Sequence, residues 1–563
     1  MAERSGDFSR RTFIAASGAL AAGTALSPAF AQTTAARYRR YNVTSPMGQR
    51  MLASYARGVA AMLALPPEHP QNWFRNAFIH LMDCPHGNWW FYVWHRGYVG
   101  YFEETIRNLS GDPEFAMPYW DWTQLPQMPD AMFNGVLDPG NPAFAATTRN
   151  LAVFTARMKP ALAAYWSTLN AAQLAQLALR GYPTLDAVWN DVDGYSPAQQ
   201  IGVAGNIAFS PPCSARYLTR DNPKLDAKTA YDVSPPVITA GLAPTVFNQP
   251  DIQNSFTSSR TPSHNTAPGS ATKFSILEGL PHNKVHNYIG GVGPLDPGPY
   301  GNMTNFLSPV DPVFFLHHSN MDRLWYVWEQ KQRRIGLPWL PTGADFQSFA
   351  SEPFLFYVDG NGNFVGNAQA GSYINTTRFG YDYEPGFGET PESAPVAKAK
   401  ARGLAMASLA ATQSGSSWTA SIPEPALKAH LAASPGLTLI AEIALARPAD
   451  PGAVREFDVL INAPDDLATV SPDSPYYAGT LAFFGPVMIH GEHGGHGGHS
   501  GHGGNAAAAD AGASFAVPLP RKPTLFALDG TKSAPVKIRL VPAGRGTSVP
   551  AAQIVKSVQL HAL

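Results

Sequence analysis

Two hydrophobic periods divide this chain, and each fits a different kind of secondary structure. In the segment WHRGYVGYFEETIRN, the residues His95, Tyr98, Val99 and Phe102 recur at the spacing i, i+3, i+4 and i+7. That spacing places all four on one face of a helix. Residues 151–180 are rich in Ala and Leu and also predict helix. The first part of the chain is therefore predicted to be mainly helical.

The C-terminal part alternates with a period of two. In REFDVLINAPDD, the residues Phe457, Val459 and Ile461 alternate with acidic side chains, and the segment VKIRLVP repeats the pattern. Such alternation is typical of half-buried strands. We therefore predict a mainly α domain at residues 32–385 and a separate all-β, sandwich-like domain at residues 436–563.

Two segments have compositions that do not favour a packed core. Residues 386–435 are rich in Ala, Ser and Pro and predict a linker, in which Lys398, Lys400 and Arg402 offer cleavage points. Residues 490–504, HGEHGGHGGHSGHGG, predict a loop within the β-domain. This loop either binds metal ions weakly or has no function, and its sequence favours neither alternative. Its histidines are His490, His493, His496, His499 and His502.

The N-terminus has the pattern of an export signal. Arg10 and Arg11 precede a short run of small and apolar residues that ends in the sequence Ala-Phe-Ala at residues 29–31. This pattern resembles a bacterial twin-arginine signal peptide at residues 1–31 and implies a periplasmic or secreted protein. A membrane anchor is the alternative, but the run is short and is broken by Pro28.

The charge balance narrows the classes of partner. The chain has 563 residues, with 40 Lys and Arg against 41 Asp and Glu, and only 14% of its residues are charged. The average for soluble proteins is about 25%. Nothing here predicts the basic groove of a nucleic-acid-binding protein. We expect neither nucleic acid nor a membrane as a partner.

The histidines of the helical part fall into two groups. His80 and His86 precede His95, which points inward with its apolar helix face. A buried imidazole without a partner is costly, so it needs a hydrogen bond or a metal. Downstream, His282 and His286 have the i, i+4 spacing that stacks two imidazoles on one helix face.

A third string, DPVFFLHHSNMDRLWYVW, completes the second group. His318 lies one helical turn before Asp322, which could accept a hydrogen bond from an imidazole N–H. The alternative is that Asp322 pairs with Arg323 or with another surface cation. Three histidines at 80–95 and three at 282–318 suggest two three-histidine sites. Copper, zinc, iron and nickel all suit such ligands, whereas no E-x-x-H spacing supports a carboxylate-bridged di-iron site.

The motifs CPHG-x-W-x-F-x-x-WHR, PHNKVHN and DPVFFLHH-x-N-x-DRLW resemble the two copper-binding signatures of tyrosinases. That family, together with catechol oxidases and haemocyanins, has a binuclear type 3 copper site. The resemblance runs from about residue 38 to residue 383, and it implies a four-helix bundle around two copper ions. The C-terminal domain is similar to the β-domain of plant polyphenol oxidases.

Carried over by position, the resemblance implies two sets of copper ligands. His80, with His69 as the alternative, His86 and His95 correspond to the first set. The second set corresponds to His282, His286 and His318, the second histidine of the HH pair.

The resemblance also implies a crosslink. In relatives with a C-x-H motif, the cysteine sulfur is joined to the imidazole of the histidine two residues on, which corresponds to Cys84 and His86. The alternative is a disulfide between Cys84 and Cys213, the only two cysteines of the chain.

The activity implied is that of a tyrosinase, which uses dioxygen to hydroxylate monophenols and to oxidise ortho-diphenols to ortho-quinones. Glu278 and Asn283 match positions that hold an activating water in relatives, although Glu278 could also be a helix-start carboxylate. The alternatives are a catechol or ortho-aminophenol oxidase that lacks hydroxylation and, more remotely, a haemocyanin-like oxygen-binding protein.

A last expectation concerns regulation. In relatives the β-domain lies across the copper site and inserts one side chain, which keeps the enzyme latent. Phe483, Phe484 and Met488 are the candidate side chains here. The alternative is a domain that stabilises the fold or assists copper loading.

Overall fold

The computed structural model describes residues 36–192, 216–249, 255–266, 272–389, 408–432, 437–448, 450, 452–467, 470–485, 512–526 and 532–563. Tyr38–Leu563 form one compact unit, and everything below concerns that unit. The signal predicted at 1–31, Cys213, Met488 and the loop predicted at 490–504 lie outside the described residues. Within the described stretches, no helix combines the length and the apolar character that crossing a membrane would require.

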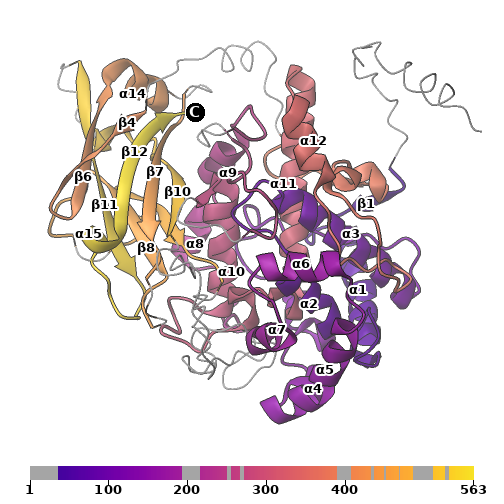
Figure 1. Ribbon diagram of the computed structural model, residues 1–563. Helices are drawn as coiled ribbons and strands as arrows, with labels where there is room; N and C mark the ends of the chain where they lie inside the picture. The colour runs from indigo at the N-terminus through magenta and orange to yellow at the C-terminus, as the bar shows by residue number, and fades with distance from the viewer. Residues whose placement is uncertain are drawn as a thin grey trace, which may run out of the picture. The chain divides into compact units, whose positions relative to one another are not determined.

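Four helices carry His80, His95, His286 and the pair His317–His318: α2 (Trp73–Asp83), α3 (Phe91–Ser110), α10 (Asn283–Gly290) and α11 (Val313–Ile335) (Figure 1). His282 ends the π-helical turn Glu278–His282 just before α10. Helix α3 packs against α11 and against α1 (Pro46–Ala64). The other α-helices of the described residues are α4 (Pro142–Thr148), α5 (Leu151–Trp166), α6 (Ala171–Leu179), α7 (Leu185–Val192), α8 (Ala227–Asp232), α9 (Pro235–Leu242), α12 (Gly343–Ser351), α14 (Glu424–Leu431) and α15 (Ala551–Ile554).

Local sequence signals set the ends of these helices. The Asn72 side chain accepts hydrogen bonds from the first backbone N–H groups of α2, as an N-cap residue does. Gly291 ends α10 with a φ of 99°, a conformation that glycine adopts without strain. All eleven residues of α2 are buried. This helix is therefore surrounded by protein and has no polar face that a periodic pattern could reveal.

The β-part consists of two five-stranded sheets with the orders β2-β10-β7-β12-β4 and β5-β6-β11-β8-β9. Apolar side chains from both sheets form one core, as in a sandwich. The strands are β2 (Thr272–Phe274), β4 (Leu409–Ala410), β5 (Thr412–Ser414), β6 (Ser417–Pro423), β7 (Leu439–Ala446), β8 (Glu456–Ile461), β9 (Tyr477–Ala482), β10 (Gly512–Pro518), β11 (Ser533–Ala543) and β12 (Val555–Ala562). The predicted fold class, a mainly α domain followed by a β-domain, is confirmed.

The boundary between the two parts differs from the prediction. Residues 408–432, inside the segment expected to be a linker, form β4, β5, β6 and α14. Their Ala- and Ser-rich composition concealed two short strands at the ends of the sheets, β4 and β5, and also β6, which pairs with β11. In the other direction, β2 belongs to the helical part by sequence but pairs in parallel with β10, so that Lys273 lies opposite Ser514.

Strand β8 also departs from the expected half-buried pattern, because all six of its residues are buried. Its acidic side chains do not face solvent. Glu456 forms an ion pair with Lys284 of α10, and Asp458 forms one with Lys228 of α8. The alternating pattern does correspond to a strand, but the polar face of this strand lies against helices.

A small parallel sheet closes the helical part, where β1 (Tyr38–Arg40) pairs with β3 (Tyr381–Tyr383). Arg40 and Tyr383 point from these strands onto Asp322 of α11. The two ends of the predicted α domain are therefore joined beside the helix that carries His318.

Candidate metal centre

The first group of histidines comes from α2, α3 and the loop between them. His80 Nδ1 donates to the Phe306 carbonyl oxygen at 2.7 Å, and His95 Nδ1 donates to the Phe91 carbonyl oxygen at 2.7 Å. Their Nε2 atoms face one another at 3.3 Å. Because each neutral ring donates its one N–H proton from Nδ1 to a carbonyl oxygen, both Nε2 atoms have lone pairs, and these face one another.

His86 lies on the loop between α2 and α3. Its Nε2 is buried and has no hydrogen-bond partner among the described residues. The His86 ring centroid is 5.3 Å from that of His80 and 5.4 Å from that of His95. On its other side, His86 Nδ1 lies 3.4 Å from the Sγ of Cys84, the buried C-cap residue of α2.

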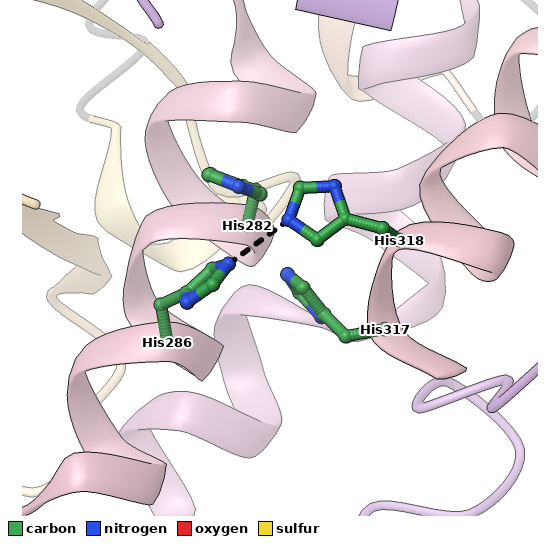
Figure 2. Close-up of side chains that lie close together, drawn as sticks. All are labelled: His282, His286, His317 and His318. Atoms are coloured by element: carbon green, nitrogen blue, oxygen red, sulfur yellow. Dashed lines mark hydrogen bonds between the residues drawn. The ribbon is translucent and has the colours of Figure 1, made fainter. Parts of the chain in front are cut away.

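The second group gathers His282, His286, His317 and His318, and Figure 2 shows their rings converging from two helical segments. His286 Nδ1 donates to the Met303 carbonyl oxygen at 2.8 Å, and its Nε2 lies 3.1 Å from the Nε2 of His318. His282 Nδ1 donates to Asn283 Oδ1 at 3.0 Å, and its Nε2 has no partner among the described residues.

The indole of Trp122 distinguishes the two adjacent histidines. Trp122 Nε1 donates to His317 Nδ1 at 3.0 Å. An indole nitrogen can only donate, so His317 Nδ1 must accept and its ring proton must be on Nε2. A protonated Nε2 has no lone pair for a metal. The geometry thus favours His318 over His317 as the third ligand of this group.

The two groups form one centre. The rings of His95 and His318 stack with centroids 4.2 Å apart, and those of His86 and His282 are 5.6 Å apart. His69, the alternative to His80, lies before α2, where its Nδ1 accepts from the Gln71 backbone N–H. His80 is completely buried among the other histidines, so the structure brings His80 and not His69 to the centre.

The electrostatics favour neutral imidazoles. Burial lowers the pKa of all the clustered histidines, and repulsion between neighbouring rings lowers the pKa of most of them further. Burial lowers the pKa of His282 to about 3. In His80, His95, His282 and His286, a protein oxygen holds the Nδ1–H group, so each neutral ring presents its Nε2 lone pair, as metal-binding histidines do. A metal ion would satisfy the unpartnered buried Nε2 atoms, so these residues fit one.

Asp322 does not have the predicted position, because it contacts no histidine. It accepts from Arg96 Nε at 2.6 Å, from Arg40 Nη1 at 3.0 Å and from the hydroxyl of Tyr383 at 2.6 Å. Two buried guanidiniums compensate a buried carboxylate better than a neutral ring would. The alternative partner, Arg323, instead reaches Asp121 and the Phe387 carbonyl oxygen.

Glu278 is completely buried beside the centre. Its carboxylate accepts from the Gly87 backbone N–H and from the Ser258 hydroxyl, each at 2.5 Å. Burial raises the pKa of Glu278 to about 8, although these two hydrogen bonds oppose the rise. Asn283 Oδ1 accepts from His282, and its Nδ2 donates to the Ala482 carbonyl oxygen of β9 at 3.0 Å.

One side chain of the β-part enters the centre. The Phe484 ring centroid lies 4.6 Å from that of His286, 5.0 Å from that of His86 and 5.6 Å from that of His282. Phe483 points the other way and packs on Phe515 in the core of the β-part. Of the two described candidates for an inserted side chain, the structure brings only Phe484 to the histidines.

The sequence of this chain is similar to the sequences of several known proteins. Residues 59–331 match the family described as the common central domain of tyrosinase. Polyphenol oxidase II of Ipomoea batatas is 26% identical over 385 residues, which are 65% of this chain and 52% of that protein. A hemocyanin of Enteroctopus dofleini is 34% identical over 113 residues, 20% of this chain and 9% of that protein.

The chain spans about half the length of the first of these relatives. Among solved structures, latent aurone synthase superposes with a TM-score of 0.53 at 17% identity and covers 95% of this chain and 91% of that chain. This similarity extends over both the helical part and the β-part. At such low identity it shows a shared fold.

Proposed function

We propose that the chain is a copper-dependent oxidase of phenols, because its residues 59–331 match the common central domain of tyrosinase. The observation that carries the proposal is the approach of His80 Nε2 to His95 Nε2 at 3.3 Å. Each ring donates its one proton from Nδ1 to a carbonyl oxygen, so each Nε2 has a lone pair that faces the other. Lone pairs repel at this distance unless a cation lies between them.

Two copper ions are the proposed cofactors. His80, His86 and His95 would hold the first, and His282, His286 and His318 would hold the second. Copper, when bound, supplies the redox chemistry by which dioxygen oxidises the phenol. The chain contributes neutral imidazoles in fixed orientations and, with Phe314 and Phe306 around them, an apolar surrounding that suits an aromatic substrate.

We further propose that the enzyme hydroxylates monophenols as well as oxidising ortho-diphenols to ortho-quinones. A phenol has a pKa near about 10, so hydroxylation needs a base. Glu278 and Asn283 would hold the water that accepts this proton. Supporting this role, both side chains are buried: Asn283 contacts His282, and Glu278 accepts from the backbone N–H of Gly87, the residue after His86. A catechol or ortho-aminophenol oxidase is the second candidate, and an oxygen carrier is the third because of the hemocyanin match.

A thioether between Cys84 and His86 is proposed as part of the site. The approach of Cys84 Sγ to within 3.4 Å of His86 Nδ1 supports it, and a crosslink would fix the one ligand that lies on a loop. Peptide mapping after reduction should recover the segment of both residues two hydrogens lighter and resistant to alkylation. Alkylated Cys84 would rule the crosslink out.

Latency is proposed for the full chain. Phe484 supports it, because an aromatic ring in contact with three of the proposed ligands occupies space that a phenol ring would need. The β-part would then act as a shield that must move before turnover.

We also propose that residues 1–31 direct twin-arginine export to the periplasm or beyond, which N-terminal sequencing of the exported protein would test.

The experiment for the main proposal combines metal analysis with oxygen uptake. Copper-loaded protein should contain two copper ions per chain and should consume dioxygen with a monophenol and with an ortho-diphenol. Uptake with the diphenol alone would favour the catechol oxidase. Reversible oxygen binding without turnover, also after limited proteolysis, would favour the oxygen carrier. Full occupancy by a different metal would contradict all three.

A further inference from the structure

Two arginines line a hollow in the β-part, outside the histidine centre. Arg447 follows β7 and Arg455 precedes β8, and both border a small hollow that is partly open to solvent. Phe483 and Asp450 border the same space. The hollow thus lies against the end of β9, from which Phe484 reaches the histidines.

The guanidinium of Arg455 is buried without an anionic partner. The residue is 5% exposed, and its side chain forms no hydrogen bond or ion pair with any residue that the structure describes. The ring of Tyr300 lies beside it, with its centroid 4.8 Å from the guanidinium carbon. An isolated buried charge is strongly unfavourable unless something pairs with it.

Arg447 is in a similar position. It donates to the carbonyl oxygens of Phe484 and Gly485, but its Nε is buried without a partner among the described residues. Burial, and then the charge of Arg455, lower the pKa of Arg447 to about 9. Two cations therefore repel one another beside the hollow.

The nearby carboxylates have other partners. Glu456 forms its ion pair with Lys284, and Asp296 accepts from the Tyr300 hydroxyl and from backbone N–H groups. Asp450 is exposed and accepts from the Gly452 backbone N–H. Asp296 and Glu456 act on Arg455 only at longer range, because neither forms an ion pair with it.

We propose that Arg447 and Arg455 form a binding site for a small oxyanion of the phosphate or sulfate class. Such an anion accepts several hydrogen bonds from guanidinium groups and would cancel the repulsion between them. It would also brace Arg447, which holds the backbone of Phe484 and Gly485. The site is independent of copper and of the proposed activity.

Calorimetric titration of the full chain with inorganic phosphate tests the site, with sulfate, acetate and chloride compared at equal ionic strength. Phosphate or sulfate should bind saturably at one per chain and raise the melting temperature, whereas acetate should bind less tightly and chloride should not saturate. Arg455→Gln should weaken binding about tenfold or more. It should not destabilise the anion-free protein, because it removes an unpaired charge.

Lys537→Gln is the matched control. It removes one positive charge from an exposed ion pair on β11 and should leave phosphate binding unchanged. A second measurement needs no variant: phosphate should protect Arg447 and Arg455 from modification by phenylglyoxal. The proposal is overturned if phosphate does not saturate, if Arg455→Gln binds equally well, or if both arginines react equally with and without phosphate.

Discussion

At the scale of single residues, a hydrogen-bond donor decides which neighbour can hold a metal. Trp122 fixes the proton of His317 on Nε2, whereas no such donor contacts His318 among the described residues. We expect His318→Gln to lose one of two copper ions and His317→Gln to keep both. Metal analysis of the two adjacent variants makes the comparison. Copper loss from His317→Gln alone would reverse the assignment.

Glu278 is expected to matter for one substrate class more than for the other. Glu278→Gln should lower monophenol hydroxylation by about 10²–10⁴-fold, which is typical of removing a general base. Diphenol oxidation should fall far less, because it needs no hydroxylation. Oxygen uptake with paired substrates measures both. An equal loss on both would assign Glu278 the structural role of joining Gly87 to Ser258.

His264 gives a pH dependence of stability. Burial alone would lower its pKa, but Asp83 and Glu352, at 2.9 and 2.6 Å, outweigh burial and hold the pKa above its ordinary value. A raised pKa stabilises the folded state below the unfolded value of about 6.5, and this stabilisation is lost as pH rises through the folded value. The free energy of unfolding should therefore fall above about pH 6.5. His264→Gln should flatten that fall, and an unchanged slope would contradict it.

At the scale of elements, α10 joins the two parts of the molecule. Its inner face carries His286, and its other faces place Lys284 on Glu456 of β8 and Asn287 on the Phe483 carbonyl oxygen. Lys284→Met should cost about 3–5 kcal/mol of unfolding free energy, because it leaves Glu456 buried and unpaired. The double variant Lys284→Met/Glu456→Leu should recover much of the loss. Additive losses in denaturant unfolding would show that the pair is not coupled.

Elements also show what the sequence could predict. The spacing of His282 and His286 and the motif around His318 indicate helices and group the histidines that we propose as ligands. The carbonyl oxygens of Phe91, Phe306 and Met303 could not be found in this way, because any residue supplies a carbonyl. Asp322 was misassigned because its strongest partners, Arg40 and Arg96, are distant in sequence and no local pattern announces them.

At the scale of the whole molecule, the β-part is built into the helical part. Strand β10 extends its sheet onto β2, which ends four residues before Glu278, and Ala482 of β9 holds Asn283. Displacing the β-part would therefore free the site from Phe484 and also release the residues proposed to hold the activating water. The proposed latency would therefore involve both blocked access and held side chains.

Phe484 provides the test of that arrangement. Phe484→Ala should raise diphenol turnover severalfold in the uncut chain at unchanged copper content, because it removes the ring that contacts His86, His282 and His286. Limited proteolysis within residues 390–407 should activate the native chain but should add little to Phe484→Ala. Oxygen uptake and metal analysis before and after cleavage measure both effects. If Phe484→Ala keeps the activity of the native chain while cleavage still activates both, Phe484 does not block the substrate, and the β-part restrains the centre through its contacts with α10.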